Sequence, residues 1–266
     1  MLDVLLTSSP LAPAASPVRI AYRDIGGGSP IVILHGGWGY DAYPFDRQIA
    51  ALAPRHRIVI PDRSGYGSSS PLDALPTDFH QRAADETRAV IEALGLERPI
   101  VWGHSDGAII ALLMGLAAPE RMSGAIVEAT HFFKQKPGSR AFFEQVAARP
   151  RSKFLEVHAR TWLRLADAAG PGEDFYGGRL SEFKPPVLVI HGARDPRTEP
   201  GELEALRAAL GRTDRSAPAR MVVLPEGSHS PHSEQATSAK VIEAALHFLA
   251  AVAGEADTRS GISFHG

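Results

Sequence analysis

The sequence contains no cysteine, which removes several kinds of chemistry at once. Disulfide bonds, thiolate nucleophiles and cysteine-based metal sites are excluded. No apolar run reaches the length of a membrane-spanning helix. The formal net charge is only −2, so the composition gives no electrostatic reason to expect a nucleic acid or an anionic membrane as a partner. Repeats and low-complexity tracts are also lacking. A chain of 266 residues with 44% hydrophobic content is typical of one large globular domain, or one domain with an insertion.

The N-terminus does not fit a signal peptide. Residues 1–6 are mostly apolar, but Asp3 stands where an export signal needs a basic residue. Small residues at 12–15 have some likeness to a cleavage site. We expect a cytoplasmic protein.

Short apolar runs alternate with helical patterns along most of the chain. After a first strand near the N-terminus, further strands are predicted at 18–24, 30–34, 57–60, 99–102, 124–129, 186–190 and 220–224. Helices are predicted between them, at 44–53, 78–94, 108–118, 203–210 and 234–252, and the polar tail 258–266 is expected to fray. This alternation predicts an α/β fold, with a mainly parallel, doubly wound sheet of eight strands covered on both faces.

One long interval breaks the alternation. Residues 132–184 contain no apolar strand run, only helical patterns such as the one around Trp162. An excursion of that length favours an inserted helical lid over a loop. We therefore expect a core domain of residues 1–131 and 185–266 with a lid at 132–184.

The stretch Gly103-His104-Ser105-Asp106-Gly107 joins a predicted buried strand to a predicted buried helix. A serine between two glycines at such a joint has the pattern G-x-S-x-G of a nucleophile elbow. The glycines permit the sharp turn, and the serine hydroxyl then stands above the sheet. In a chain with 25 glycines the motif alone is weak, so its context has to support it.

The context lies at the ends of later strands. Asp195 follows the strand at 186–190, and His229 follows the strand at 220–224. Ligands of open α/β sheets bind beyond the carboxyl ends of the strands, so Ser105, Asp195 and His229 are expected on one rim. A serine needs an imidazole to accept its proton, and the imidazole needs a carboxylate to orient it.

With these residues in place, the chain resembles serine hydrolases of the α/β-hydrolase fold. The likeness covers almost all of the chain outside the lid and rests on five ordered motifs: His35-Gly36-Gly37, Asp62-Arg63-x-Gly65-x-Gly67-x-Ser69, the elbow, His191-Gly192-x-x-Asp195 and Gly227-x-His229-x-x-His232-x-Glu234.

The resemblance implies an esterase-like enzyme that forms an acyl-enzyme on Ser105 with a small-molecule acyl substrate and no cofactor. It implies an oxyanion hole made by the N–H groups of Gly37 and Asp106, with Trp38 as the alternative to Gly37. Other chemistry on the same scaffold stays open: C–C hydrolase, lactonase, proline-iminopeptidase-like, perhydrolase or hydroxynitrile lyase, and also a ligand receptor without catalysis. Dehalogenase and epoxide-hydrolase chemistry are disfavoured, because those relatives use an aspartate at the position of Ser105.

Two choices within the triad remain open. Glu128, near the end of its strand, competes with Asp195 for the acid, and we favour Asp195 from its position beyond a strand end. His232 competes with His229, which matches the family's position. The two histidines are three residues apart, but no further ligand set accompanies them, so no metal site is expected.

The side chain of Asp106 is either paired with donors beneath the site or lines the pocket. In the pocket it would raise the energy of a nearby oxyanion and would need a cationic neighbour, for which Arg63 is the candidate. Rim and lid side chains are expected to form an apolar substrate pocket: Trp38, His131, Phe132 and Trp162. The oligomeric state is open, with a homodimer as one option.

Overall fold

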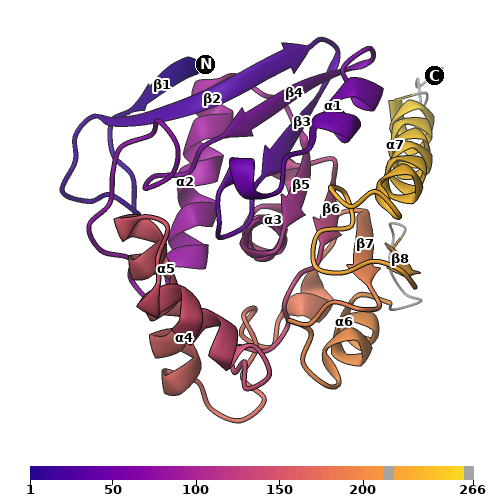
Figure 1. Ribbon diagram of the computed structural model, residues 1–266. Coiled ribbons are helices and arrows are strands. Elements are labelled where there is room, and N and C mark those ends of the chain that lie inside the picture. Colours follow the sequence, from indigo (N-terminus) through magenta and orange to yellow (C-terminus); the bar gives the residue numbers. More distant parts are fainter. Residues whose placement is uncertain (212–218, 261–266) are drawn as a thin grey trace.

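The fold is built on a central sheet of eight strands in the order β1-β2-β4-β3-β5-β6-β7-β8 (Figure 1). The computed structural model describes residues 1–211 and 219–260, with side chains up to residue 254. The strands are β1 (Leu2–Leu6), β2 (Val18–Gly26), β3 (Ser29–Leu34), β4 (His56–Pro61), β5 (Ile100–His104), β6 (Gly124–Glu128), β7 (Val187–Gly192) and β8 (Ala219–Leu224).

The sheet is antiparallel at one edge only. β1 pairs antiparallel with β2, and β2 pairs antiparallel with β4. All other neighbours are parallel, from β4 through to β8. The expected mainly parallel sheet of eight strands is confirmed. Because β3 lies between β4 and β5, the chain order reverses at the centre of the sheet, where α/β folds bind their ligands.

The two faces of the sheet bury separate apolar layers. Within β3, Ile31 and Ile33 belong to one cluster, while Val32 and Leu34 belong to the other. This alternation follows from the two-residue period of a strand and explains why the whole run is apolar.

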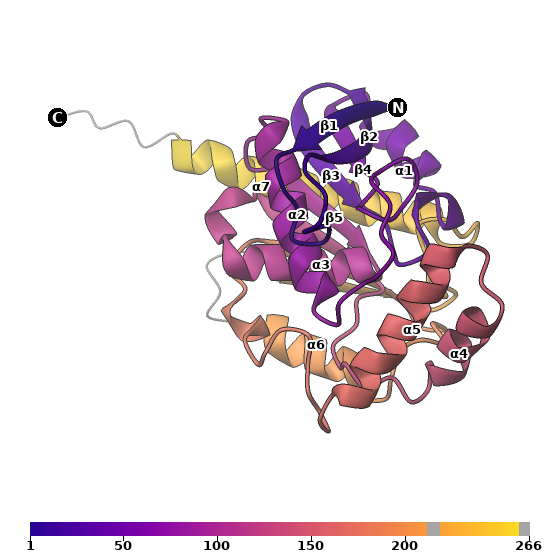
Figure 2. The same cartoon turned by 90° about the vertical axis from the view of Figure 1, so that its left-hand side faces the viewer.

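Helices cover both faces (Figure 2). The helices α1 (Asp46–Leu52) and α7 (Ser238–Ser260) pack together over one face. On the other face, α2 (Phe79–Ala93) packs beside α3 (Asp106–Ala117), with α6 (Glu202–Leu210) farther along the sheet. Residues 106–115 of α3 are all buried, as expected of a helix that is apolar all round.

The interval between β6 and β7 is helical, with α4 (Arg140–Ala148), α5 (Lys153–Ala168) and the short 3₁₀ helix η3 (Leu180–Glu182). We call residues 132–184 the insertion. Phe143, Trp162 and Phe175 of the insertion belong to the same apolar cluster as the buried side chains of α2 and α3. The division into a core domain and a lid stays a prediction.

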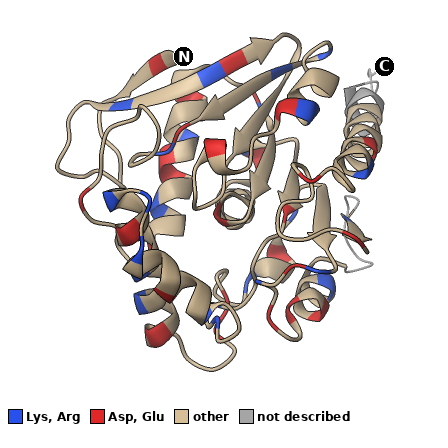
Figure 3. Cartoon of the chain, in the orientation of Figure 1, with Lys and Arg blue, Asp and Glu red and all other residues tan. Residues whose placement is uncertain are grey.

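The ends of the chain differ in detail from expectation. The last helix begins at Ser238 instead of residue 234, because residues 231–237 form turns, such as the one closed by the Ser233 N–H and the Ser230 carbonyl. It runs to Ser260, so the expected frayed tail lies mostly outside the described residues. Acidic and basic residues are mixed along the outer helices (Figure 3). No helix in the described ranges is long and apolar enough to cross a membrane.

Gly107 marks the point where α3 touches β3. A Cβ atom at Gly107 would lie 2.2 Å from the Leu34 carbonyl oxygen, and neither backbone can move aside easily. We expect Gly107→Ala to reduce the free energy of unfolding by about 3 kcal/mol or more, as measured by urea denaturation. Gly27→Ala is the control, since nothing lies within 4 Å of a Cβ at Gly27. Equal losses in the two variants would contradict the packing described here.

Candidate active site

Ser105 occupies a sharp turn between β5 and α3. Its φ is 54° and its ψ is −118°, a backbone conformation that side chains other than glycine rarely adopt. The turn is held by its own backbone, because Ser105 N–H donates to the Glu128 carbonyl at 2.9 Å and the Ser105 carbonyl accepts from Ala108 N–H at 2.9 Å. The backbone on the two sides of the turn is in close contact, since a Cβ at Gly103 would lie only 2.0 Å from the Gly107 carbonyl oxygen. The expected nucleophile elbow is therefore present in its geometry.

Asp195 and His229 meet at the same rim of the sheet, beyond the ends of β7 and β8. The His229 Nδ1 lies 2.8 Å from the Asp195 Oδ2. The other carboxylate oxygen of Asp195 accepts from the backbone N–H of Arg197 at 2.9 Å. The His229 Nε2 is buried and has no hydrogen-bond partner among the described residues. An oriented imidazole with one free nitrogen is the arrangement that a general base requires.

The charges of this pair follow from their surroundings. Burial lowers the pKa of His229 to about 4, although the hydrogen bond to Asp195 acts in the opposite direction. Burial by itself would raise the pKa of Asp195, but the hydrogen bond and charge of His229 outweigh it, and the pKa lies below its ordinary value. At neutral pH the pair is therefore an ionised carboxylate and a neutral imidazole.

His104 joins the elbow to the histidine loop. Its Nε2 lies 2.9 Å from the His229 carbonyl oxygen and 3.1 Å from the Ser230 Oγ. On its other side, a Cβ at Gly36 would lie 3.0 Å from the His104 Nδ1 and 3.2 Å from the Ser105 Cβ. The His104 ring thus contacts the glycine turn on one side and the loop that carries His229 on the other, next to Ser105.

The two expected oxyanion donors lie on either side of Ser105. Asp106 is the first residue of α3, so its N–H has no acceptor within the helix. Among the described residues, the N–H of Gly37 donates to nothing. The Gly37 turn is fixed from behind, because the Tyr66 hydroxyl donates to the Gly37 carbonyl at 3.0 Å. The role of both groups stays a prediction.

The Asp106 side chain is fully buried and accepts from three side chains. The His158 Nε2 lies 2.7 Å from its Oδ2, and the His80 Nε2 and Trp162 Nε1 each lie 3.2 Å from its Oδ1. Burial alone would raise the pKa of Asp106, but His158 and His80 together outweigh it, and the pKa lies well below its ordinary value. The expectation that Arg63 would be the partner is wrong.

Arg63 is engaged elsewhere for a structural reason. Its guanidinium donates to the His35 carbonyl and, at 3.1 Å, to the Gly36 carbonyl. These bonds stiffen the glycine turn from below. The histidines that do bind Asp106 come from α2 and from the insertion, and sequence analysis missed both because nothing in the local pattern distinguishes a histidine that reaches a distant carboxylate.

Gly37 has no room for a side chain because the insertion packs against it. A Cβ there would lie 2.3 Å from the His158 Cε1 and 2.7 Å from the Asp106 Oδ2. Helix α5 therefore rests directly on the expected oxyanion turn. Contact between the insertion and the site is made through the same histidine that binds Asp106.

The two alternatives for the triad bind each other. Glu128 is fully buried, and its Oε1 lies 2.8 Å from the His232 Nδ1 and 2.9 Å from the His232 backbone N. The His232 ring stacks on Phe45 at 3.8 Å between centres. Since Asp195 is the carboxylate that binds His229, this second pair supports the loop that carries His229.

The expected pocket residues divide into two groups. The His131 ring lies parallel to the His229 ring at 5.8 Å and is 5.8 Å from Trp162. Trp38 lies 5.3 Å from the His158 ring. His131 thus lies beside His229, whereas Trp162 lies against His131 and Trp38 against the histidine that binds Asp106. Phe132 instead has its ring against Phe133 and Tyr176. Whether any of them contacts a substrate stays a prediction.

A buried ion pair fixes the segment that carries His131. The Lys136 Nζ lies 2.5 Å from the Glu202 Oε1, and both side chains are almost completely buried. The same oxygen accepts from the Phe132 backbone N–H at 2.6 Å. Burial would raise the pKa of Glu202, but His131 and Lys136 outweigh it and lower it. Sequence analysis did not identify this pair.

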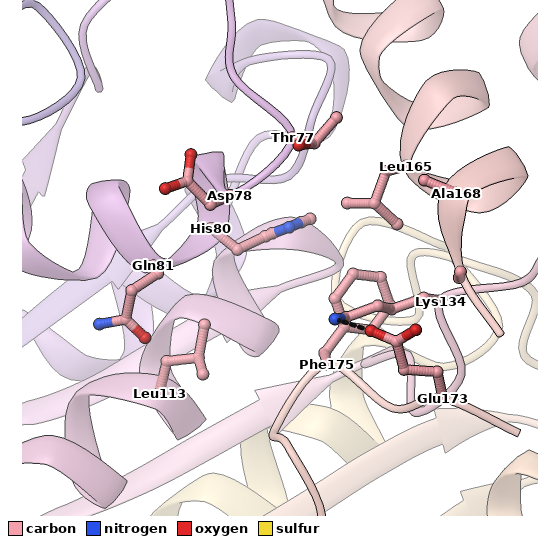
Figure 4. Close-up of a pocket in the computed structure, with 11 residues that line it drawn as sticks. Thr77, Asp78, His80, Gln81, Leu113, Lys134, Leu165, Ala168, Glu173 and Phe175 are labelled. Atoms are coloured by element: carbon pink, nitrogen blue, oxygen red, sulfur yellow. Dashed lines mark hydrogen bonds and ion pairs between the residues drawn. The ribbon is translucent and has the colours of Figure 1, made fainter.

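Two cavities lie near the insertion, and no triad residue lines either of them. One, of about 310 Å³, is lined by His80, Leu113 and Phe175 among others, and the Lys134–Glu173 ion pair lies at its wall (Figure 4). The other, of about 330 Å³, is lined by Lys136, Phe143 and Trp162 among others. Within the described ranges, no three His, Asp or Glu side chains are grouped so that they could hold a metal ion.

A family model described as the alpha/beta hydrolase family matches residues 31–242. The chain belongs to this family. It is a hydrolase, and the fold and resemblance expected from the motifs are confirmed. The match includes the elbow, the Asp195 loop and the His229 loop.

Individual relatives are distant or partial. The mouse serine hydrolase BPHL is 26% identical over 241 residues, which cover 82% of this chain and 79% of that protein. RutD from Azorhizobium caulinodans is 39% identical, but over only 101 residues, 38% of this chain and 37% of that relative. A thermophilic esterase from Thermogutta terrifontis has a TM-score of 0.68 at 22% identity, covering 95% of this chain and 99% of that structure. That structure shows the fold only.

The Asp106 carboxylate can be tested through stability. Asp106→Asn replaces one acceptor oxygen by an NH₂ group that faces N–H donors, so we expect the free energy of unfolding to fall by about 1–3 kcal/mol, measured by urea denaturation. Asp85→Asn removes only a half-exposed ion pair with Arg88 and should cost about 0.5 kcal/mol or less. A loss at Asp106 no larger than at Asp85 would contradict the role of Asp106 as acceptor.

Proposed function

We propose that this hydrolase cleaves small carboxylic esters through an acyl-enzyme on Ser105. The observation that carries the proposal is the His229–Asp195 pair at 2.8 Å, with the second imidazole nitrogen unoccupied, on the same rim as the serine elbow. Serine, imidazole and carboxylate in this chain order are the triad of α/β-hydrolases.

The reaction follows from these positions. The Ser105 Oγ attacks the ester carbonyl while its proton passes to the His229 Nε2. The oxyanion accepts from the N–H groups of Gly37 and Asp106. His229 then gives its proton to the departing alcohol, and the acyl group stays bound to Ser105 as the acyl-enzyme. In the second half, water attacks the acyl carbon and loses a proton to His229. The bond between the acyl carbon and the Ser105 Oγ then breaks, His229 returns the proton to the Oγ, and the acid is released.

The charge of Asp106 fits this scheme only because of its partners. An unpaired carboxylate next to an oxyanion would oppose its formation. Three N–H donors bind the Asp106 carboxylate from the side of α2 and the insertion, while its backbone N–H belongs to the first turn of α3. The Asp106 side chain therefore accepts hydrogen bonds on one side, while its backbone N–H remains a donor for the oxyanion on the other.

The surroundings favour a small substrate. Ser105 is only 7% exposed. Nearby, the Trp38 ring packs against His158 and the Trp162 ring against His131. We propose that the substrate is a small acyl compound and that the enzyme needs no cofactor. We also propose that the protein is cytoplasmic and that residues 132–184 form a lid.

Labelling tests the nucleophile. We expect a fluorophosphonate probe to modify Ser105, and p-nitrophenyl acetate hydrolysis to fall in Ser105→Ala to the background given by residual binding and the oxyanion hole. Mass spectrometry locates the label. Tight ligand binding without labelling or turnover would favour a receptor on this scaffold instead.

The choice of acid is tested by a pair of variants. Asp195→Asn should reduce kcat by about 10⁴-fold, because His229 loses the carboxylate that fixes its tautomer. Glu128→Gln removes a charge from His232 only, so its effect should be on stability, with kcat reduced much less. The reverse ranking in steady-state kinetics would assign the acid to Glu128.

The pH profile follows from the pKa of His229. Protonation removes the lone pair that accepts the serine proton, so activity falls as the pH drops through the pKa of about 4. We expect kcat/KM to be independent of pH from about 6 to 7.5 and to decrease near pH 4. Circular dichroism over the same range separates this loss from unfolding. A decrease centred near 6.5 would show that His229 is solvated in the working enzyme.

A further inference from the structure

Arg197 lies at the edge of the candidate site, two residues after Asp195. Its side chain is half-buried among three aromatic rings. The Nη2 lies 3.4 Å from the Tyr43 hydroxyl, and the guanidinium carbon is 4.2 Å from the centre of the Phe142 ring and 5.9 Å from that of Trp38. The rings come from the rim loop and from α4, so Arg197 lies where the insertion meets the core.

The guanidinium of Arg197 lacks an anionic partner. Of the arginines that are not exposed in the described ranges, it alone meets neither a carboxylate nor a carbonyl oxygen. The others are bound to aspartates or backbone carbonyls: Arg23, Arg57, Arg63, Arg82 and Arg88. Asp195 is not its partner: the Asp195 oxygens bind His229 and the Arg197 backbone N–H, and not the guanidinium. The five N–H donors of this planar fork thus make only one hydrogen bond, a long one to the Tyr43 hydroxyl.

This unpaired cation is close to the reacting groups. The Tyr43 ring lies 6.5 Å from the His229 ring and 5.4 Å from the His104 ring, and Trp38 directly follows Gly37. The positive charge of Arg197 adds to the effect of burial in lowering the pKa of His229. A short molecule with its carbonyl at Ser105 is therefore the ligand whose anionic group we consider for Arg197.

The carboxylates around the site already have hydrogen-bond donors of their own. Asp106 binds His80 and His158, and Glu202 binds Lys136. Among the described residues, Arg197 is therefore left without a bound counter-ion, and its guanidinium fork matches the two oxygens of a carboxylate. We propose that Arg197 binds a carboxylate of the substrate, so that the preferred esters are short and carry a free carboxylate. This inference rests on the proposed function and specifies its substrate class.

Matched pairs of esters test the proposal. Monomethyl succinate against dimethyl succinate places the carboxylate on the acyl side, and acetoxyacetate against methyl acetoxyacetate places it on the alcohol side. Hydrolysis is followed by pH-stat. We expect wild-type protein to prefer the carboxylate ester in one pair, which identifies the side. Arg197→Gln should lower that preference, the ratio of the two kcat/KM values, by about 10- to 100-fold, and Arg197→Lys should retain part of it.

Arg194→Gln is the matched control, because Arg194 lies in the same loop with an exposed side chain. It should leave the preference unchanged. If Arg197 only joins the insertion to the core through its ring contacts, Arg197→Gln will lower kcat/KM equally for both esters of a pair, and the proposal fails. It also fails if the wild-type protein shows no preference in either pair.

A binding measurement separates this proposal from the proposed function. In the Ser105→Ala background, titration calorimetry with monomethyl succinate and with acetoxyacetate needs no turnover. For the ester on the preferred side, Arg197→Gln should raise Kd by about 10- to 100-fold, even if Ser105 proves not to be the nucleophile. An unchanged Kd for both compounds would overturn the carboxylate site, whatever labelling of Ser105 shows.

Discussion

The backbone of α3 approaches β3 and β5 so closely that side chains are excluded at two positions. A Cβ at Gly103 would overlap the Gly107 carbonyl, and one at Gly107 would overlap the Leu34 carbonyl. The turn between them leaves Ser105 in a backbone conformation that it would not adopt alone. The position of the serine, the direction of the first N–H groups of α3 and the place of the glycine turn after β3 all depend on this approach.

Three buried carboxylates around the turn each bind a histidine. The three pairs differ in what the other nitrogen of the histidine, or the other oxygen of the carboxylate, contacts. Asp195 binds His229, whose second nitrogen has no partner, so this pair can move a proton. Glu128 binds His232, whose second nitrogen lies 3.1 Å from a backbone carbonyl, so this pair is structural. Asp106 accepts hydrogen bonds from two histidines, which stabilise the carboxylate next to the expected oxyanion. The same chemical pair therefore has three uses, decided by what its other atoms meet.

Sequence patterns predicted much of this arrangement because they report local constraints. The apolar runs predicted the buried strands. The ends of parallel strands meet at one edge of the sheet, which predicted the rim position of Ser105, Asp195 and His229. The choice of Asp195 over Glu128 as the partner of His229 also agreed with the structure. The partners of Asp106 could not be predicted, because His80 and His158 reach it from separate helices. Nothing in a helical pattern indicates which distant carboxylate a histidine will meet.

The same limit applies to specificity, and it explains why the insertion matters. The proposed nucleophile, base and acid lie outside the insertion. Within the insertion, His158 rests on Gly37, Phe142 lies against Arg197, and Trp162 donates to Asp106. Each of these contacts joins the insertion to a residue beside the reacting groups. A change in the insertion would alter the charge and shape of the site without touching the triad. Because Ser105, Asp195 and His229 lie outside the insertion, the surroundings of this proposed triad can change while the three residues stay the same.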